Sequence, residues 1–459
     1  MPSNPDTQKI TVIGAGLVGS LISIMLARRG YDVELYERRP DMRVEKISAG
    51  RSINLAISTR GLYALKQVEL EQKILDIAVP MKGRMIHTQK RLSPNSSACE
   101  TMFQAYGKDE SQYINSIPRG ELNKILMTEA EKTGRVKIHF NHTLAAQDLK
   151  GWLEMHPNRL IIGTDGSTSV VREHLSTLNP QFKETQDTLS HGYKELTIPA
   201  KSGGGFLLEK NALHIWPRGS FMLIALPNQD GSFTCTLFLP WVGPVSFDTL
   251  KTPTDVERFF NEYFPDSVPL IENLSETFFT NPTGKMVTIK CSPWFSTHRL
   301  LLLGDAAHAI VPFFGQGMNC GFEDCTVLSE WMDRSPQDWV SQLEPYFHSR
   351  KPNSDAIADL AVDNFIEMRD RVGDPKFLLK KEVEKILQNR FPEKYISRYG
   401  LVTFSRHPYS VALEAGKIQE KILEQLCSGL SNPNDVDLRL AEKLIDKEFT
   451  PFFKKSTHS

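Results

Sequence analysis

The chain has 459 residues and a formal net charge of −1, with 54 Lys and Arg against 55 Asp and Glu. This length allows two or three domains with sizeable cores, and the balanced charge excludes the strongly basic field typical of nucleic-acid-binding proteins. The six cysteines stand singly, with no CxxC pair. The sequence therefore indicates neither a zinc site nor a redox dithiol, and it favours a reducing, intracellular compartment.

Neither end of the chain predicts a segment that crosses a membrane or directs export. Residues 1–8 are polar and lead directly into an apolar strand, which leaves no room for a signal peptide. No run approaches about eighteen uncharged apolar residues, so we expect no transmembrane helix. Apolar residues recur beside lysines near the C-terminus, at Leu440, Leu444, Ile445, Phe449, Phe452 and Phe453. They form either an interfacial face for a membrane surface or the docked face of a C-terminal helix.

The first strand opens a segment with the pattern of a dinucleotide-binding βαβ unit. Residues 9–13 are a β-branched run that predicts a strand. The sequence GAGLVG follows at once, and an apolar helix is expected from residue 17 to about residue 29, where Gly30 stops it. A second strand at residues 32–36 ends in Glu37. This order of elements predicts a bound ADP-ribose moiety.

Each part of this unit has a physical role. Gly14 allows the tight turn, Gly16 lets a pyrophosphate approach the backbone, and Gly19 lets the helix pack on the strand. The helix N-terminus offers free N–H groups and a partial positive charge to phosphates, and Glu37 can accept hydrogen bonds from a ribose. We therefore assign the dinucleotide to Gly14, Ala15, Gly16, Leu17, Gly19, Glu37 and Arg38.

The middle of the chain alternates helices and strands up to about residue 190 and then changes character. The expected helices lie at residues 60–75, 119–132 and 169–175, and the expected strands at 82–87, 136–140 and 159–163. Residues 91–112 are rich in Ser, Asn and Gly and predict a surface excursion. Turn residues then separate four short strands of a predicted antiparallel sheet, at residues 193–198, 213–216, 221–226 and 233–239. Residues 320–331 and most of 335–450 are expected to be helical.

Two apolar strands each stop at a glycine and an aspartate. Residues 161–166 read IIGTDG and residues 301–305 read LLLGD. An acid such as Asp165 or Asp305 at the ligand edge of a parallel sheet suits a polyol hydroxyl and would repel a bare phosphate. Because NAD has no ribityl chain for Asp305 to hold, the dinucleotide is predicted to be FAD. The alternative is that Asp305 only caps the next helix.

The segment after Asp305 completes the predicted cofactor site. Residues 311–319 read VPFFGQGMN. Backbone N–H groups of this loop, that of Gly317 among them, are expected at a flavin ring carbonyl, and the dipole of the following helix would favour a reduced, negatively charged ring. The sequence thus predicts an α/β fold with a Rossmann-like FAD-binding domain (residues 1–190 and 291–335), an inserted antiparallel-sheet substrate domain (191–290) and a helical C-terminal region (336–459).

These motifs resemble those of a known enzyme family. GxGxxG, the internal Asp-Gly and the late Gly-Asp together resemble the single-component FAD-dependent aromatic hydroxylases, the group A flavoprotein monooxygenases. Longer segments resemble the branch that hydroxylates L-kynurenine, in its fungal form: GRSINLAIS, MKGRMIH, LHIWPR, FMLIALPN, GDAAHAIVPFFGQGMNCGFED and NFIEMRD. The likeness runs from the first strand to about Arg406, nearly nine-tenths of the chain.

The resemblance implies particular site residues. Arg84 and Tyr106 match the residues that hold the substrate's α-amino-acid carboxylate, and Asn364 and Tyr399 match two further substrate contacts. A guanidinium binds a carboxylate bidentately and a phenol adds one donor, although Tyr113 is an alternative to Tyr106. Family FAD contacts fall on Ala56, Arg119, Leu144, Asp305, Met318 and Asn319.

The reaction that the resemblance implies is hydroxylation of L-kynurenine to 3-hydroxykynurenine, in tryptophan degradation towards quinolinate and NAD. FAD stays bound, NADPH is a transient reductant, O2 is the oxidant, and the flavin C4a-hydroperoxide carries the oxygen, so no side chain is assigned a catalytic step. His87 and His308 attract attention as bases, but we expect core or supporting roles for both. The strands of residues 213–239 and the 312–314 segment are expected to exclude water from the reaction.

Some features leave alternatives open. Residues 144–159 leave room for little more than one short strand pair, where the family has a longer stretch, and this departure bears on the contact at Leu144. The function alternatives are a related hydroxylase of another amino-aromatic acid, and a non-catalytic protein on the same fold, as in Rab escort proteins. The resemblance also implies a place on the cytosolic face of the outer mitochondrial membrane, with the cytoplasm as the alternative.

Overall fold

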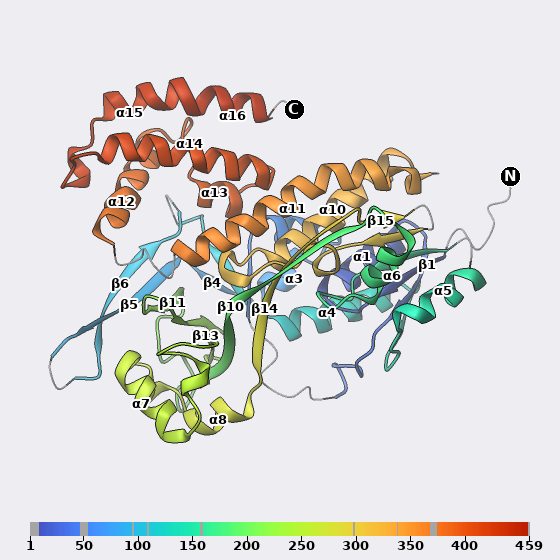
Figure 1. Ribbon diagram of the computed structural model, residues 1–459, viewed down its shortest axis with the longest axis horizontal. Coiled ribbons are helices and arrows are strands. Elements are labelled where there is room, and N and C mark those ends of the chain that lie inside the picture. The colour runs from blue at the N-terminus through green and yellow to red at the C-terminus, as the bar shows by residue number, and fades with distance from the viewer. Residues whose placement is uncertain are drawn as a thin grey trace. The chain divides into compact units, whose positions relative to one another are not determined.

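A computed structural model describes residues 9–45, 54–93, 96–107, 110–156, 159–296, 299–336, 338–367 and 374–457 (Figure 1). The chain divides into two compact units, each made of three segments. Unit 1 comprises Met1–Ala78, Ile117–Leu189 and Lys285–Ala358, and unit 2 comprises Val79–Ser116, Ser190–Gly284 and Asp359–Ser459. Compact units need not coincide with functional domains, so the predicted three-domain division stays a prediction.

Unit 1 is built on a six-stranded, mainly parallel sheet with the order β15-β16-β9-β1-β2-β8. Its strands are β1 (Lys9–Ile13), β2 (Asp32–Tyr36), β8 (Val136–His139), β9 (Leu160–Gly163), β15 (Phe295–Ser296) and β16 (Leu300–Leu302). Strand β1 pairs in parallel with both β2 and β9, and β9 pairs in parallel with β16. The carboxyl ends of these strands therefore meet at one edge, where open α/β sheets bind their ligands. The strands predicted for this sheet are confirmed.

Helices of unit 1 follow these strands, as the alternating pattern predicts. They are α1 (Leu17–Arg28), α2 (Thr59–Gln67) after strand β3 (Asn54–Ile57), α3 (Glu71–Leu75), α4 (Arg119–Lys132), α5 (Ala146–Met155), α6 (Val170–Leu178), α9 (Asp305–His308), α10 (Gly317–Arg334) and the first part of α11 (Leu343–Ile366). Helix α1 is buried along almost its whole length and packs against α4 and α10. The start of α1 is therefore held firmly at the edge of the sheet.

One expectation for unit 1 is wrong. The sequence predicts at most a short strand pair at residues 144–159, but the structure has helix α5 there. Leu149, Trp152 and Leu153 recur at helical spacing, and Leu149 is fully buried. Asp148 accepts a hydrogen bond from the N–H of Ala145 at 3.0 Å, which satisfies a donor at the helix start. The spacing of the apolar residues, not the length of the stretch, decides the local structure.

Unit 2 contains most of a seven-stranded sheet with the order β14-β10-β13-β12-β11-β5-β6. Its strands are β5 (Gly83–Arg91), β6 (Cys99–Ala105), β10 (Lys183–Ile198), β11 (Ala212–Pro217), β12 (Met222–Pro227), β13 (Phe233–Pro240) and β14 (Thr283–Ser292). Strands β10 to β13 pair antiparallel, which confirms the predicted sheet. Strand β5 joins it by pairing in parallel with β11, where Arg84 lies opposite Leu213.

The expectation of a surface excursion at residues 91–112 is partly wrong. Strand β6 lies within that stretch and pairs antiparallel with β5. Most of its residues are exposed, because β6 is the last strand of the sheet. An exposed edge strand tolerates the polar composition that predicted a loop. Strands β4 (Val79–Met81) and β7 (Ile114–Pro118) flank this hairpin and pair with each other.

Helices complete unit 2. They are α7 (Pro253–Tyr263), α8 (Leu274–Thr280), α12 (Pro375–Arg390), α13 (Arg398–Thr403), α14 (Tyr409–Cys427), α15 (Leu438–Leu444) and α16 (Thr450–Thr457). The predicted helical character of the C-terminal part of the chain is confirmed.

The apolar residues near the C-terminus pack on unit 2 itself. Ile445 and Phe449 are 0% and 1% exposed. The ring centroid of Phe449 lies 5.5 Å from that of Tyr395 and 5.7 Å from that of Phe453. These side chains therefore form a docked face, while Leu440 remains on the surface. Among the described residues, no helix combines the length and apolarity needed to cross a bilayer.

Because the C-terminal segment is docked through Phe449, removal of this side chain is expected to destabilise the protein strongly. Phe449→Ala is expected to lower the free energy of unfolding by about 3–5 kcal/mol, as removal of a buried phenylalanine ring does. Phe452→Ala is the matched control, because Phe452 is only partly buried. Denaturant unfolding of the two variants measures the difference, and equal losses in both would contradict the docking.

Candidate active site

The glycine-rich turn after β1 has the geometry that the sequence predicts. Gly14 has a φ of +101°, and a Cβ there would lie 2.7 Å from the carbonyl oxygen of Thr164. A Cβ on Gly19 would lie 1.9 Å from the carbonyl oxygen of Gly14, so close packing of α1 requires glycine. At Gly16 nothing lies within 4 Å of the Cβ position, and no described side chain caps the helix that begins there. This side of the turn is therefore open to a phosphate.

Glu37 is buried at the end of β2 and holds the turn in place. Its Oε2 accepts the N–H of Ala15 at 3.0 Å. Its Oε1 accepts the backbone N–H of Arg39 at 3.0 Å and the Nε of Arg39 at 2.8 Å. Arg38, which the sequence assigns to the cofactor, is exposed. The ion pair with Glu37 is made by its neighbour Arg39.

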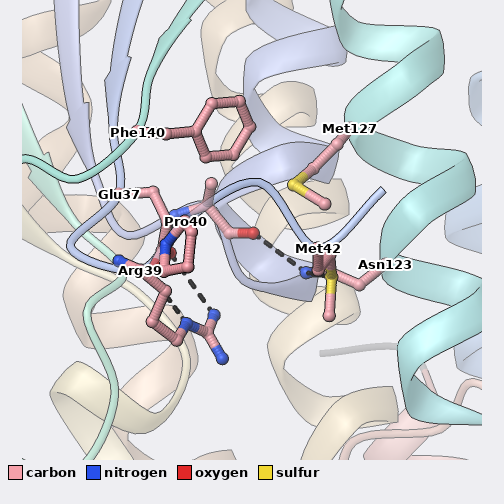
Figure 2. Close-up of a pocket in the computed structure, with 8 residues that line it drawn as sticks. Glu37, Arg39, Pro40, Met42, Asn123, Met127 and Phe140 are labelled. Atoms are coloured by element: carbon pink, nitrogen blue, oxygen red, sulfur yellow. Dashed lines mark hydrogen bonds and ion pairs between the residues drawn. The ribbon is translucent and has the colours of Figure 1, made fainter. Parts of the chain in front are cut away.

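A small pocket that is partly open to solvent lies beside Glu37 (Figure 2). Its walls are formed by Ala15, Glu37, Arg39, Pro40, Met42, Asn123, Met127 and Phe140. Asn123 of α4 is 4% exposed and donates from Nδ2 to the carbonyl oxygen of Ala15 at 3.1 Å. Apolar walls beside one buried acid suit the adenosine half of a dinucleotide. The only sequence signal for Asn123 is a polar residue on the apolar face of α4.

The two predicted strand-end acids have different environments. Gly304, not Asp305, is the N-cap of α9, and the side chain of Asp305 is exposed. The structure therefore favours a ligand role for Asp305 over helix capping. Asp165 instead accepts hydrogen bonds from Ser169 Oγ at 2.6 Å and from the N–H of Val170 at 2.7 Å, at the start of α6. Burial outweighs these bonds and raises the pKa of Asp165. Of the two acids, Asp305 has the carboxylate that a polyol hydroxyl can reach.

The loop between α9 and α10 leads to a second uncapped helix start. Gly315 adopts a φ of +67° after the short 3-10 turn Pro312–Phe314, and α10 begins at Gly317 with no described side chain capping it. Asn319 is fully buried and donates from Nδ2 to the carbonyl oxygens of Ala56 and Gly315, both at 2.9 Å. Asn319 therefore fixes Ala56 against the loop with its side chain.

The remaining predicted cofactor residues lie around these segments of unit 1. Arg119 is exposed at the first position of α4, Leu144 packs against the core, and Leu17 and Met318 are buried. The open turn at Gly16 and the two uncapped helix starts suit a diphosphate and a flavin ring carbonyl. The buried acid suits a ribose, and the exposed acid suits a polyol. The residues present therefore fit FAD.

Unit 2 places two of the predicted substrate residues, Tyr106 and Tyr399, around a third, Arg84 of β5. The guanidinium carbon of Arg84 lies 5.5 Å from the ring centroid of Tyr106 and 5.4 Å from that of Tyr399 in α13. The two rings stack on each other, with centroids 5.5 Å apart and planes at 8°. Arg84 Nε and Tyr106 Oη are buried without a hydrogen-bond partner among the described residues. Both donors are therefore left for a ligand.

Arg84 also belongs to a group of partly buried charges. Glu367 pairs with Lys381 at 3.5 Å and with Arg398 at 3.2 Å, and Lys381 also pairs with Glu384 at 3.5 Å. Burial works against the charge of Glu367, but Lys381, Arg398 and Arg84 outweigh it and lower the pKa of this carboxyl. Burial likewise works against the charge of Arg84, yet Tyr399, Tyr106 and Glu367 raise its pKa. Three cations against two anions leave one surplus positive charge, which favours an anionic ligand.

The other substrate candidates are less closely tied to Arg84. Asn364 is 4% exposed on α11, about one turn before Glu367. Tyr113, the alternative to Tyr106, is 38% exposed, so the structure favours Tyr106. The remainder of the NFIEMRD motif, residues 368–370, lies outside the described residues, as do residues 50–53 of GRSINLAIS.

His87 has the core role that the sequence predicts. Its Nδ1 lies 2.7 Å from Asp266 Oδ2, and its Nε2 lies 2.9 Å from His214 Nδ1. Burial, more than any charged neighbour, lowers the pKa of His214 to about 4, so that ring is neutral near pH 7. The two histidines and Asp266 hold strands of the sheet together and are engaged with one another.

Comparisons with known proteins agree with this geometry. A family profile described as an FAD binding domain matches residues 7–202 and 280–361. A protein of Myxococcus xanthus named kynurenine 3-monooxygenase is 55% identical over 457 residues, covering 97% of this chain and 96% of the relative. A protein of the same name from Dictyostelium discoideum is 44% identical, covering 95% of this chain and 97% of the relative.

Solved structures show the same fold at lower identity. The tetrameric form of 2-methyl-3-hydroxypyridine-5-carboxylic acid oxygenase has a TM-score of 0.61 at 21% identity, covering 80% of this chain and 94% of that chain. PqsL of Pseudomonas aeruginosa, in complex with 2-aminobenzoylacetate, has a TM-score of 0.59 at 15% identity, covering 79% of this chain and 97% of that chain. At these identities the likeness establishes the fold alone.

Fold, cofactor turn and family profile define the chain as an FAD-dependent aromatic monooxygenase. It belongs to the kynurenine 3-monooxygenase family, because relatives of that name match it at 42–55% identity over 91–98% of its length. The non-catalytic alternative is thereby dropped. The expected fungal affinity stays a prediction.

Proposed function

We propose that this protein hydroxylates L-kynurenine to 3-hydroxykynurenine, with FAD as bound cofactor, NADPH as transient reductant and O2 as oxidant. The observation that carries the proposal is the Arg84 cluster. L-Kynurenine is an α-amino acid, and its carboxylate is the group that Arg84 Nε and Tyr106 Oη, both buried and unpartnered among the described residues, are suited to bind. The names of the relatives support the choice of kynurenine among α-amino acids.

The charges around Arg84 also suit the other end of the zwitterion. Glu367 is the carboxylate whose charge acts on Arg84, and its lowered pKa keeps it negative near neutral pH. A retained negative charge in that position gives the substrate's α-ammonium group an electrostatic partner. Asn364, about one turn earlier on α11, adds an amide that can hydrogen-bond either charged group.

The reaction needs positioning more than proton transfer by a side chain. NADPH gives up two electrons, one oxygen atom of O2 enters the ring ortho to the amino group, and the other leaves as water. Bound FAD supplies the oxygen-transfer chemistry, for which the C4a-hydroperoxide is the expected donor. The protein's residues bind the amino-acid end and exclude water from the ring. The water-excluding role of β11 to β13 stays a prediction, since side chains such as Trp216 and Leu237 fill the core of unit 2.

NADPH oxidation by the FAD-loaded protein tests this proposal. L-Kynurenine is expected to stimulate flavin reduction and NADPH consumption, and 3-hydroxykynurenine should accumulate in step. Other amino-aromatic acids are expected to stimulate much less. A larger response to one of those acids would replace kynurenine as the substrate, and no response to any of them would contradict the proposal.

The pathway and the cellular location rest on the family resemblance. We place the reaction in tryptophan degradation towards quinolinate and NAD, and the protein on the cytosolic face of the outer mitochondrial membrane, with the cytoplasm as the alternative. The C-terminal apolar face packs on the protein, so attachment would depend on other residues. Fractionation of cells that express the full chain distinguishes the two locations.

A further inference from the structure

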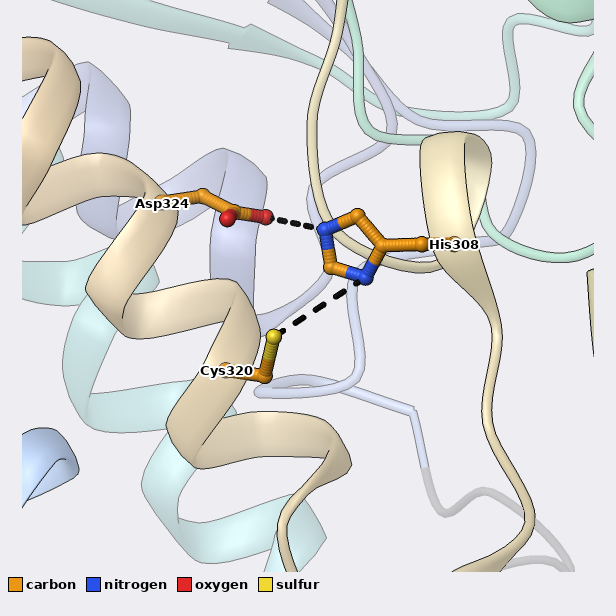
Figure 3. A group of neighbouring side chains, drawn as sticks. All are labelled: His308, Cys320 and Asp324. Atoms are coloured by element: carbon orange, nitrogen blue, oxygen red, sulfur yellow. Dashed lines mark hydrogen bonds and ion pairs between the residues drawn. The ribbon is translucent and has the colours of Figure 1, made fainter. Parts of the chain in front are cut away.

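A buried carboxylate joins the two segments of unit 1 that are predicted to hold the flavin half of FAD. Asp324 of α10 is fully buried, and its Oδ2 accepts the N–H of Gly304 at 3.1 Å and lies 2.5 Å from Nε2 of His308. Its Oδ1 accepts Nε of Arg350 at 2.9 Å. Figure 3 shows Asp324 and Cys320 directed from one helix towards His308. The carboxylate therefore ties the turn before Asp305 to the body of α10.

The contact with Arg350 extends this site into a chain of charges. Arg350 donates from Nη1 to Glu323 Oε2 at 2.7 Å, and Arg60 donates from Nε to Glu323 Oε1 at 2.9 Å. The side chains of Arg350, Glu323 and Arg60 are 4%, 8% and 0% exposed. Charges buried this deeply persist only when each has a partner. These paired charges therefore keep Asp324 ionised and fixed in position.

This network of buried charged side chains is not electrically neutral. Burial works against a charge on His308, but Asp324 and Cys320 outweigh it and raise the pKa of this imidazole well above its usual value. The network thus sets the cations Arg60, Arg350 and His308 against the two carboxylates of Glu323 and Asp324. One surplus positive charge therefore lies behind the Gly304–Asp305 turn, in surroundings where solvent screens it little.

A metal ion is a less suitable explanation of this cluster. His308, Cys320 and Asp324 offer ligand atoms within 4.8 Å of one another. Both oxygens of Asp324 are already engaged, however, and Nη2 of Arg350 lies 3.6 Å from Cys320 Sγ. A cation placed among these atoms would be repelled by the guanidinium at short range. The arrangement is that of a charge network that holds backbone.

We propose that Asp324 is a positioning residue of the cofactor site, and that the charge chain around it supplies one positive charge that favours the reduced, anionic flavin. The inference rests on FAD binding and on neither kynurenine nor NADPH. When Asp324 fixes Gly304, it sets the direction of the Asp305 carboxylate towards a polyol. The same carboxylate holds α10, whose uncapped start would offer its N–H groups to a flavin ring carbonyl.

Titration of the apoprotein with FAD tests the positioning role. Asp324→Asn is expected to raise the Kd for FAD by on the order of tenfold or more, because a charge-assisted contact to the turn is lost. Asp333→Asn is the matched control on the same helix, since Asp333 is 62% exposed in its ion pair with Arg29. If Asp324→Asn lowers the melting temperature of the apoprotein but leaves the Kd equal to that of the control, the role is structural only and the proposal is overturned.

The midpoint potential of the bound flavin tests the charge. His308→Gln keeps a donor that can reach Asp324 but removes the positive charge, so the potential is expected to become more negative than in the native protein. His348→Gln, at a side chain 68% exposed, is the control and should leave the potential unchanged. Equal potentials in the two variants overturn the proposal even where Asp324→Asn fails to fold. Both measurements need only FAD, so a failure of the proposed kynurenine reaction would leave them interpretable.

Discussion

Arg84→Ala is expected to raise the KM for L-kynurenine about 100-fold, the loss of roughly 3 kcal/mol that removal of a charge-assisted contact gives. Nε of Arg84 is buried and has no hydrogen-bond partner among the described residues. The substrate carboxylate is its proposed partner. The FAD content should stay unchanged, because the cofactor residues belong to unit 1 and Arg84 belongs to unit 2. Steady-state kinetics and flavin absorbance of the purified variant measure the two effects.

Two further variants make the Arg84 prediction specific. Arg91→Ala removes an exposed arginine from the same strand and should leave the KM unchanged. Arg84→Lys keeps the charge but loses the bidentate geometry, so an intermediate KM is expected. An Arg84→Ala enzyme with the native KM would remove this residue from the substrate site.

Gly16→Val is expected to abolish FAD binding without unfolding the protein. Gly16 has φ −73° and ψ −172°, a conformation open to any residue, and nothing lies within 4 Å of its Cβ position. The new side chain would therefore fill space that the structure leaves for the pyrophosphate. As an N-cap replacement it should lower stability by only about 1 kcal/mol. FAD titration and thermal unfolding of the apoprotein measure the two quantities separately.

The control for Gly16→Val is a glycine that is equally free of neighbours. Gly151 lies in α5 and also has nothing within 4 Å of its Cβ position, so Gly151→Val should bind FAD normally. Gly14→Ala should instead destabilise the fold itself, because its Cβ would lie 2.7 Å from the Thr164 carbonyl oxygen. If Gly16→Val bound FAD with native affinity, the pyrophosphate would have to lie elsewhere.

Sequence patterns were most informative where function depends on consecutive residues. The turn after β1 could be predicted because Gly14 and Gly19 each meet a local steric demand, while Gly16 leaves space on the ligand side, and the structure shows both features. The four strands of residues 193–239 could be predicted because short apolar runs alternate with turn residues. In both cases the deciding interactions lie within one supersecondary unit.

Contacts between distant segments account for most of what the sequence could not reveal. Asn123 reaches Ala15 across 108 positions, and the role of Glu367 depends on Lys381, Arg398 and Arg84 together. Tertiary contacts of this kind leave no periodic signal. For Asp165 the sequence pattern suggests too much. An acid directly after a strand predicts a ligand contact, but the Asp165 carboxylate accepts hydrogen bonds from Ser169 and Val170 at the start of α6.

The charge chain behind the cofactor turn illustrates the same limit. The sequence marks His308 as a possible base. Its role in the network can be recognised only from the structure, where one oxygen of Asp324 lies 2.5 Å from His308 and the other accepts a hydrogen bond from Arg350. Each member looks like an ordinary charged residue when taken alone. Burial of all five turns them into a single network, and burial of a charged side chain is not readable from composition.

Incorporation of labelled oxygen shows whether this protein hydroxylates L-kynurenine with an oxygen atom from O2. The FAD-loaded protein is incubated with L-kynurenine and NADPH under ¹⁸O₂, and the product is examined by mass spectrometry. We expect 3-hydroxykynurenine that carries one ¹⁸O atom, with the second labelled atom recovered in water. A product without label, or NADPH consumed with no hydroxylated kynurenine formed, would contradict it.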